Sequence, residues 1–131
     1  MRRTSDMKII PRNVHGFLDY PVGLILAALP WLFGFADNGP ATVIPVVLGA
    51  GAVIYSLLTN YELGVARVIP FRVHLVIDFI SGLFLAVSPW LFNFSHRVYW
   101  PHLIFGLLEM GIVLLTRVDP APAVQPVATG R

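Results

Sequence analysis

The hydrophobic positions of this chain gather into four long stretches, and most of its polar residues lie in the links between them. The stretches cover residues 14–35, 43–60, 73–94 and 100–116. A helix rises 1.5 Å per residue, so about 20 apolar residues cross the ~30 Å hydrocarbon core of a membrane. The pattern therefore predicts four transmembrane helices, of which the last is the shortest.

The same pattern occurs twice along the chain. Residues 14–19 (VHGFLD) recur as residues 73–78 (VHLVID), and residues 30–35 (PWLFGF) recur as residues 89–94 (PWLFNF), both 59 positions apart (74 − 15). A two-span unit returns the chain to the side where it started, so two such units are parallel copies related by a pseudo-two-fold axis along the membrane normal. We expect an all-α fold, a four-helix transmembrane bundle built from two parallel two-helix repeats.

The second helices of the two repeats align with a different offset. Gly49 and Thr59 match Gly106 and Thr116 at 57 positions (106 − 49), so the hairpin link is two residues shorter in the second repeat. Both hairpin links are short, which favours tight antiparallel pairs. The last residues contain three prolines and no apolar period, which is typical of disorder. The predicted segments are an N-terminal segment (1–13), the first repeat (14–60), a link (61–72), the second repeat (73–117) and a disordered tail (118–131).

Composition and charge support a membrane location and suggest an orientation. Hydrophobic residues make up 56% of the chain and charged residues 12%, whereas a soluble domain carries about 25% charged residues. Eight of the nine Arg and Lys residues lie on the side of the termini and the central link, and only Arg97 lies on the other side. This bias predicts a multi-pass protein of the cell membrane with both termini in the cytoplasm. The chain has no cysteine, which excludes disulfides and thiolate metal sites, and no basic cluster that would predict nucleic-acid binding.

The first and third predicted helices carry the same ridge of residues at steps of four. Small residues at this spacing allow two helix backbones to approach closely. We therefore expect the first and third helices to contact each other through the glycine and alanine of each ridge. The ridges consist of His15, Asp19, Gly23, Ala27 and Trp31 in the first helix and of His74, Asp78, Gly82, Ala86 and Trp90 in the third.

The tripeptide Ser88-Pro89-Trp90, placed in the first helix of a two-span repeat, resembles the motif of the SPW-repeat family of small bacterial integral membrane proteins. The first repeat has Leu29-Pro30-Trp31 at the matching place, and the resemblance covers both halves of the chain. It implies a membrane location and four helices, and it brings no established activity. Proline lacks an N–H and disturbs the preceding turn, so both prolines are expected to kink or end their helices, with the tryptophans at headgroup depth.

The repeated His and Asp residues are the main candidates for chemistry. His15 and Asp19 are four residues apart, as are His74 and Asp78, so each pair shares a helix face near the cytoplasmic interface. Several interpretations stay open. In the first, each Asp accepts a hydrogen bond from its His, and the pairs only fix the packing. In the second, the pairs relay protons or pass a cation, because ionisable residues inside spans tend to mark pathways. In the third, two imidazoles and two carboxylates bind zinc or a similar ion. Axial haem ligation by the two histidines is a further alternative.

Glu109 is a second candidate because it lies near the middle of the last predicted helix. A charged carboxylate at that depth costs about 3 kcal/mol, so we expect a protonated acid that is hydrogen-bonded inside the bundle. Its counterpart in the first repeat is Ala52, and His102 lies seven residues earlier on the same face. Tyr55 and Ser56 on the second helix are the expected partners. A structural hydrogen bond and a role in proton handling or transport are both open.

No nucleotide-binding loop, nucleophile triad or established metal motif appears in the sequence, so it predicts neither an enzyme nor a cofactor. The leading hypothesis is a small scaffold or accessory membrane protein. The alternatives are an oligomeric channel or transporter for protons or a small cation, and a metal- or haem-binding membrane redox protein. The expected partners are the lipid bilayer and either a second copy of the chain or another membrane protein.

Overall fold

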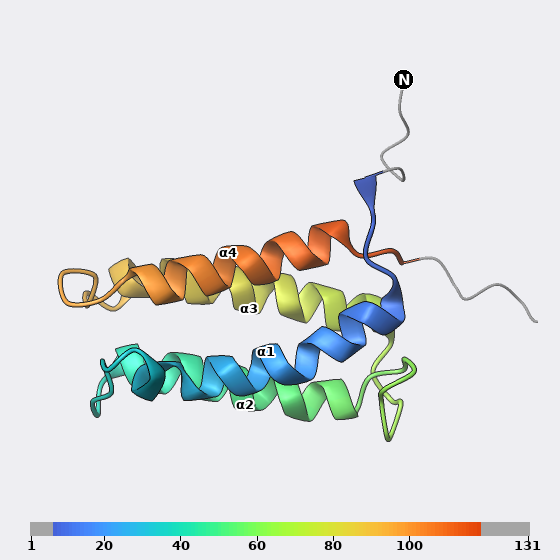
Figure 1. Ribbon diagram of the computed structural model, residues 1–131, viewed down its shortest axis with the longest axis horizontal. Coiled ribbons are helices and arrows are strands. Elements are labelled where there is room, and N and C mark those ends of the chain that lie inside the picture. The colour runs from blue at the N-terminus through green and yellow to red at the C-terminus, as the bar shows by residue number, and fades with distance from the viewer. Residues whose placement is uncertain (1–6, 119–131) are drawn as a thin grey trace, which may run out of the picture.

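Four helices make up the protein in the computed structural model, which describes residues 7–118 (Figure 1). They are α1 (Arg12–Leu32), α2 (Pro40–Leu57), α3 (Phe71–Leu91) and α4 (Trp100–Leu115). The first three are long and apolar enough to cross a membrane, and α4 is a shorter apolar helix of 16 residues. The all-α expectation is confirmed, whereas the disorder predicted for the tail falls almost entirely outside the described residues.

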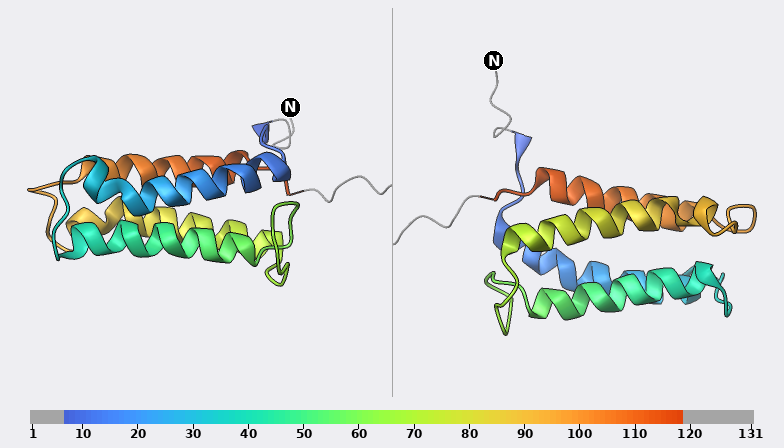
Figure 2. Two further views of the ribbon diagram at one scale, coloured as in Figure 1. Left: turned by 60° about the horizontal axis from the view of Figure 1, so that its bottom comes forward. Right: turned by 180° about the vertical axis from the view of Figure 1, so that it is seen from behind.

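The helices form two antiparallel hairpins, α1 with α2 and α3 with α4, that lie side by side (Figures 1 and 2). Helices α1 and α3 start at the same end of the bundle and run in the same direction, so the two repeats are parallel copies. We call the end where α1 and α3 begin the termini end. The opposite end, which carries the α1–α2 and α3–α4 links, is the hairpin end.

The small residues of the two ridges pack within each hairpin. A Cβ atom added to Gly49 of α2 would overlap backbone atoms of Gly23 and Ala27, and one added to Gly106 of α4 would overlap Gly82 and Ala86. The expectation that these ridges join α1 to α3 is therefore wrong. Gly23 of α1 meets Gly49 of α2, and Gly82 of α3 meets Gly106 of α4, so these small residues bring the two members of a hairpin together.

An apolar core holds the two hairpins together at the hairpin end. Its members come from α1, α2, α3 and both hairpin links. The buried residues of this core are Leu26, Leu29, Phe35, Ala41, Ile44, Leu85, Phe94 and Val98.

Both repeats end their first helix with the same turn. Helices α1 and α3 stop two residues after Pro30 and Pro89, where the prolines predicted an end. Each proline carbonyl accepts hydrogen bonds from two backbone N–H groups of the following link, at 2.9 and 3.1 Å in the first repeat and 2.8 and 2.9 Å in the second. Gly34 (φ +69°) and Asn93 (φ +57°) adopt the left-handed conformation that reverses the chain, which these two residue types tolerate.

The serine of the tripeptide completes this turn in the second repeat. Because Pro89 has no N–H, the carbonyl of Leu85 loses its usual helical donor. The Ser88 hydroxyl donates to that carbonyl instead, at 2.8 Å. Trp31 and Trp90 are 64% and 54% exposed just before the hairpin links, and their location at headgroup depth stays a prediction. The motif therefore ends a helix, which explains why its serine is replaced by leucine in the first repeat without loss of the turn.

Candidate metal centre

Two equivalent backbone pairings tie the repeats together at the termini end. The segment before α1 runs beside the end of α4, where Ile10 pairs with Thr116, and the segment before α3 runs beside the end of α2, where Ile69 pairs with Thr59. The backbone hydrogen bonds of both pairings are 2.8–3.0 Å long. Each pairing joins one repeat to the other and places a threonine beside the first turn of the neighbouring helix.

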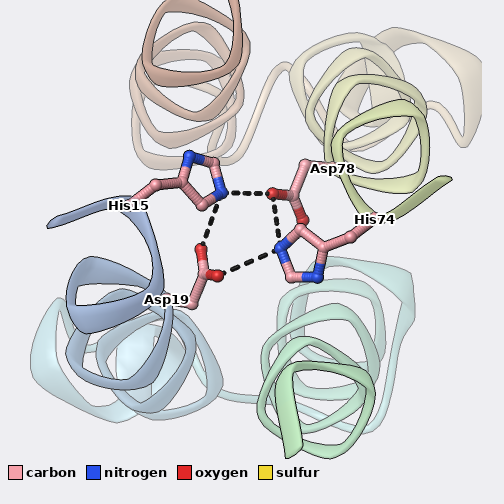
Figure 3. Close-up of side chains that lie close together, drawn as sticks. All are labelled: His15, Asp19, His74 and Asp78. Carbon is pink, nitrogen blue, oxygen red and sulfur yellow. Dashed lines mark hydrogen bonds and ion pairs between the residues drawn. The ribbon is translucent and has the colours of Figure 1, made fainter. Parts of the chain in front are cut away.

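Four polar side chains converge inside this end, two from α1 and two from α3 (Figure 3). His15 Nε2 lies 3.2 Å from Asp19 Oδ1 and 3.0 Å from Asp78 Oδ2. His74 Nε2 lies 3.0 Å from Asp19 Oδ2 and 3.1 Å from Asp78 Oδ2. Histidines and aspartates therefore alternate around a ring, to which Asp19 contributes both carboxylate oxygens and Asp78 one; we call it the His–Asp ring. One such atom from each residue lies within 4.8 Å of all the others.

A threonine of the opposite repeat fixes each histidine. Thr116 Oγ1 lies 2.8 Å from His15 Nδ1, and Thr59 Oγ1 lies 2.7 Å from His74 Nδ1. Each hydroxyl donates its single hydrogen to a backbone carbonyl four residues earlier, at 2.6 Å for Thr116 and 2.7 Å for Thr59. A hydroxyl that has given its hydrogen away can only accept, so both histidine Nδ1 atoms must be the donors. Both Nε2 atoms are left facing the His–Asp ring.

The Nε2 atom of His74 has no hydrogen bond of acceptable geometry, although two carboxylate oxygens lie within 3.1 Å of it. Neither oxygen lies in line with a hydrogen on that nitrogen. A neutral imidazole with its hydrogen on Nδ1 presents a lone pair on Nε2, which is how metal-binding histidines are usually held. A doubly protonated imidazole would instead donate to the carboxylates, as His15 Nε2 can to Asp78. The ring can therefore hold a cation or form an ion-paired cluster.

Two tyrosines hold the carboxylates, and both come from the first half of the chain. Tyr55 Oη on α2 donates to Asp78 Oδ1, and Tyr61 Oη in the central link donates to Asp19 Oδ2 at 3.0 Å. Burial above all, together with the charge of Asp19, raises the pKa of the Tyr61 hydroxyl, which keeps it a neutral donor at physiological pH. The position that matches Tyr55 in the second repeat holds Ile112. The four ring residues therefore follow the repeat symmetry, whereas the tyrosines that hydrogen-bond the two carboxylates do not.

The central link covers the His–Asp ring at the termini end. Tyr61 is 3% exposed and packs with Phe71 at the start of α3. Its ring lies so close to Gly16 that a Cβ there would come within 2.5 Å of it. Under this cover His15 and His74 are 1% and 0% exposed. The two imidazoles are therefore fully buried, and the side chains of Asp78 and Asp19 are 6% and 13% exposed. Charges with so little access to water are stable only if they are paired or bind an ion.

Glu109 lines a small cavity next to the ring. The cavity offers about 20 Å³ to the centres of water-sized molecules, and His15, Asp19 and Asp78 also line it. No described side chain hydrogen-bonds the Glu109 carboxyl group. The expectation that Tyr55 bonds Glu109 is wrong, because that hydroxyl bonds Asp78, and the buried Ser56 hydroxyl has no partner among the described residues. The protonation of Glu109 stays a prediction.

His102 lies at the hairpin end, away from Glu109 and the ring. Its Nε2 donates to the carbonyl of Ala41 at 2.9 Å, and its ring contacts Phe35 and Phe94. It is fully buried, and no carboxylate among residues 7–118 hydrogen-bonds it. The sequence grouped His102 with Glu109 because they share a helix face, but seven residues along a helix correspond to about 10 Å.

The donor set of the ring fits a divalent metal ion and does not fit haem. Atoms at about 2.1 Å from a shared ion lie about 3.4 Å apart in a tetrahedral site. Neighbouring nitrogen and oxygen atoms here lie 3.0–3.2 Å apart, and one ligand atom from each of the four residues lies within 4.8 Å of all the others. Two carboxylates also balance the charge of a divalent ion. A porphyrin between His15 and His74 would need the space that Asp19 and Asp78 occupy, so the haem alternative is set aside.

Comparison with known proteins agrees with the fold and gives no activity. The model of the SPW repeat domain matches residues 13–116, a range that includes both repeats and the whole His–Asp ring, so the chain belongs to the SPW repeat family. No curated protein and no solved structure matches the chain. Together with the apolar helices, the family makes this a membrane protein, and the chemistry of the site must be argued from its own residues.

Proposed function

We propose that this SPW repeat protein binds one divalent transition-metal ion between its two repeats, with His15, Asp19, His74 and Asp78 as ligands. One observation carries the proposal above all others. The two threonines accept hydrogen bonds from both Nδ1 atoms, and this leaves both Nε2 atoms aimed at the space between the two carboxylates (Figure 3).

The ligand types favour a first-row transition metal over calcium or magnesium. Imidazole nitrogen suits zinc, iron, copper and nickel, whereas calcium and magnesium prefer sites made entirely of oxygen. The histidines also have the partners that orient metal ligands, because Thr59 and Thr116 hold the far side of each imidazole. The bound ion would supply the positive charge that balances the two carboxylates, which in its absence a doubly protonated histidine has to supply.

Metal content tests this proposal directly. The protein, purified in detergent and stripped with a chelator, is expected to take up one Zn²⁺, Co²⁺ or Mn²⁺ per chain. Asp78→Asn keeps the shape of the side chain and removes a charged ligand, so it should lower the affinity at least 100-fold. His96→Ala, in the exposed α3–α4 link, is the matched control and should bind like the wild type. Metal uptake no higher than background in the wild type, or unchanged affinity in Asp78→Asn, would leave the ring as an ion-paired packing device of a scaffold protein.

The proposed setting of the site is the cytoplasmic face of the cell membrane. Along the sequence, eight of the nine Arg and Lys residues precede or begin α1, lie between α2 and the start of α3 or follow α4, which supports cytoplasmic termini. Reporter fusions at Asn38 and at the C-terminus test this orientation: only the C-terminal fusion should report the cytoplasm. A cytoplasmic Asn38 would reverse the orientation and place the metal site at the outer face.

A further inference from the structure

The two sides of the His–Asp ring are packed differently. On the side of His74, the rings of Tyr55 and Tyr61 lie 4.9 and 5.4 Å from the imidazole, centre to centre. Phe71 contacts both histidines, at 6.0 Å from His74 and 5.6 Å from His15. The other three ring residues line the small cavity that Glu109 also lines. A metal ion in the ring would thus be covered by aromatic rings on one side and face a cavity on the other.

The cavity exists because the repeats differ at two positions of their second helices. Where the first repeat has Tyr55, the second has Ile112, and where the first has Ala52, the second has Glu109. Tyr55 stands next to His74 and donates to Asp78. By the repeat symmetry Ile112 stands in the same relation to the opposite His and Asp, where it has no hydroxyl to offer. Ile112 and Ala52 both line the cavity.

The size and the polar groups of the cavity suit one water molecule. About 20 Å³ for the centre of a water-sized molecule exceeds the roughly 10–15 Å³ that one buried water needs, and such a water requires two to four polar partners. The carboxyl groups of Asp19, Asp78 and Glu109 supply these partners. Apart from His15, the remaining lining residues are apolar, and the volume accommodates a single water molecule.

We infer that the metal ion keeps one exchangeable coordination position on this side, filled by a water molecule that donates a hydrogen bond to Glu109. The inference rests on the proposed metal site and adds the class of its free ligand: water, or an oxygen donor with a single heavy atom. Four protein ligands alone would close a tetrahedral site, so the water is a fifth ligand, on the side of the ring that faces the cavity. Glu109 is a positioning residue here, because it acts on the metal through the water.

The water can be detected directly with Mn²⁺ as the probe. The detergent-solubilised protein is loaded with Mn²⁺ and exchanged into D₂O, and pulsed electron–nuclear double resonance records the strongly coupled deuterons of water bound to the ion. We expect such deuterons in the wild type. Ala52→Leu fills the cavity and should abolish their signal while one Mn²⁺ per chain remains bound. Gly51→Ala, on the same helix, adds a methyl group that meets nothing within 4 Å and should leave the signal unchanged.

Glu109 variants give a second readout if Ala52→Leu does not fold. Glu109→Leu removes the acceptor and should lose the deuteron signal. Glu109→Gln keeps an oxygen acceptor and should retain the signal of the wild type. Bound Mn²⁺ without coordinated water in the wild type overturns this inference and leaves the metal site standing. A deuteron signal that persists in both Ala52→Leu and Glu109→Leu overturns it as well. Failure to bind Mn²⁺, Co²⁺ or Zn²⁺ overturns the metal site and the water together.

Discussion

Both ends of the bundle bury a histidine, but the two histidines have different partners. His102 at the hairpin end and His74 at the termini end are both 0% exposed. His102 has one carbonyl acceptor and sits between aromatic rings in an apolar core, whereas His74 faces two carboxylates and is fixed from behind by Thr59. Burial alone therefore does not mark a functional histidine. The two histidines differ in the number of carboxylates that lie close to a ring nitrogen: two for His74 and none among the described residues for His102.

The ends also differ in what holds them together. The hairpin end relies on apolar side chains from both repeats, which need no ion or proton to stay packed. The termini end has a small aromatic and apolar cluster around Tyr61 above a ring of charged groups. We expect mutations at the hairpin end to change stability alone, and mutations at the termini end to change stability and metal affinity together.

Matched histidine substitutions should show the largest contrast. His74→Phe leaves two buried carboxylates with one cation partner fewer, so it should abolish metal binding and cost about 3–5 kcal/mol of stability, the usual effect of breaking a buried ion pair. His102→Phe should cost only about 1–3 kcal/mol, because it leaves the Ala41 carbonyl unpaired, and should keep one metal ion per chain. Thermal unfolding and metal analysis of both variants check this. Loss of metal from His102→Phe would remove the distinction between the ends.

A smaller effect is expected where α3 and α4 pack closely, midway between the two ends. A leucine at Gly106 would collide with the backbone of α3 at Gly82 and Ala86, and overpacking of this kind typically costs about 1–3 kcal/mol. Gly111→Ala on the same helix meets nothing within 4 Å and is the control. Gel filtration and unfolding in detergent should show a disturbed fold in Gly106→Leu and a wild-type profile in Gly111→Ala. Equal stability of the two variants would contradict the close α3–α4 contact.

Substitutions of the threonines test whether the hydrogen bonds between the repeats affect the metal affinity of the His–Asp ring. Thr116→Val removes the acceptor of His15 Nδ1 and should weaken metal binding about 10–100-fold, as loss of a partner that orients a ligand usually does. Thr42→Val removes a buried hydroxyl at the hairpin end, where it bonds Asp37, and should leave the metal affinity unchanged. Competition with a chelator of known affinity measures both. An unaffected Thr116→Val would mean that the histidine tautomer is not set by this bond.

The smallest effect is expected from Ser88→Ala. The variant leaves the Leu85 carbonyl without the hydroxyl that bonds it, and this should cost about 1 kcal/mol of stability. Metal affinity should not change, because the serine belongs to the hairpin end. Unfolding curves and metal titration of one preparation decide this. A change in metal affinity would show that the two ends are coupled through α3.

Sequence periodicity was sufficient for the helices and for the parallel order of the repeats, because long apolar stretches and a doubled polar pattern have few other structural solutions. It was also sufficient to nominate His15, Asp19, His74 and Asp78, since equivalent residues of parallel repeats lie at equal depth. It was not sufficient to choose the partner of each ridge, because glycine spacing allows close approach without naming the neighbour.

The partners of the ring were harder to find for two different reasons. Thr59 and Thr116 were visible as a matched pair, but only the crossing of the chain segments brings each one to the histidine of the other repeat. Tyr55 and Tyr61 occur in one half only, so a search for repeated residues passes over them. Repetition in a sequence reveals what two units share, and the residues in which they differ need the three-dimensional structure.

The exchange of threonines between the repeats has an evolutionary consequence. Each histidine depends on the opposite repeat for the acceptor of its Nδ1 hydrogen, so a single repeat contains only half of each interaction. Two identical half-length chains could build the same ring as a symmetric dimer. Gene fusion would then gain nothing for the ring itself, but it would free each copy to change alone. Tyr55 in one half and Glu109 in the other are differences that no homodimer could encode.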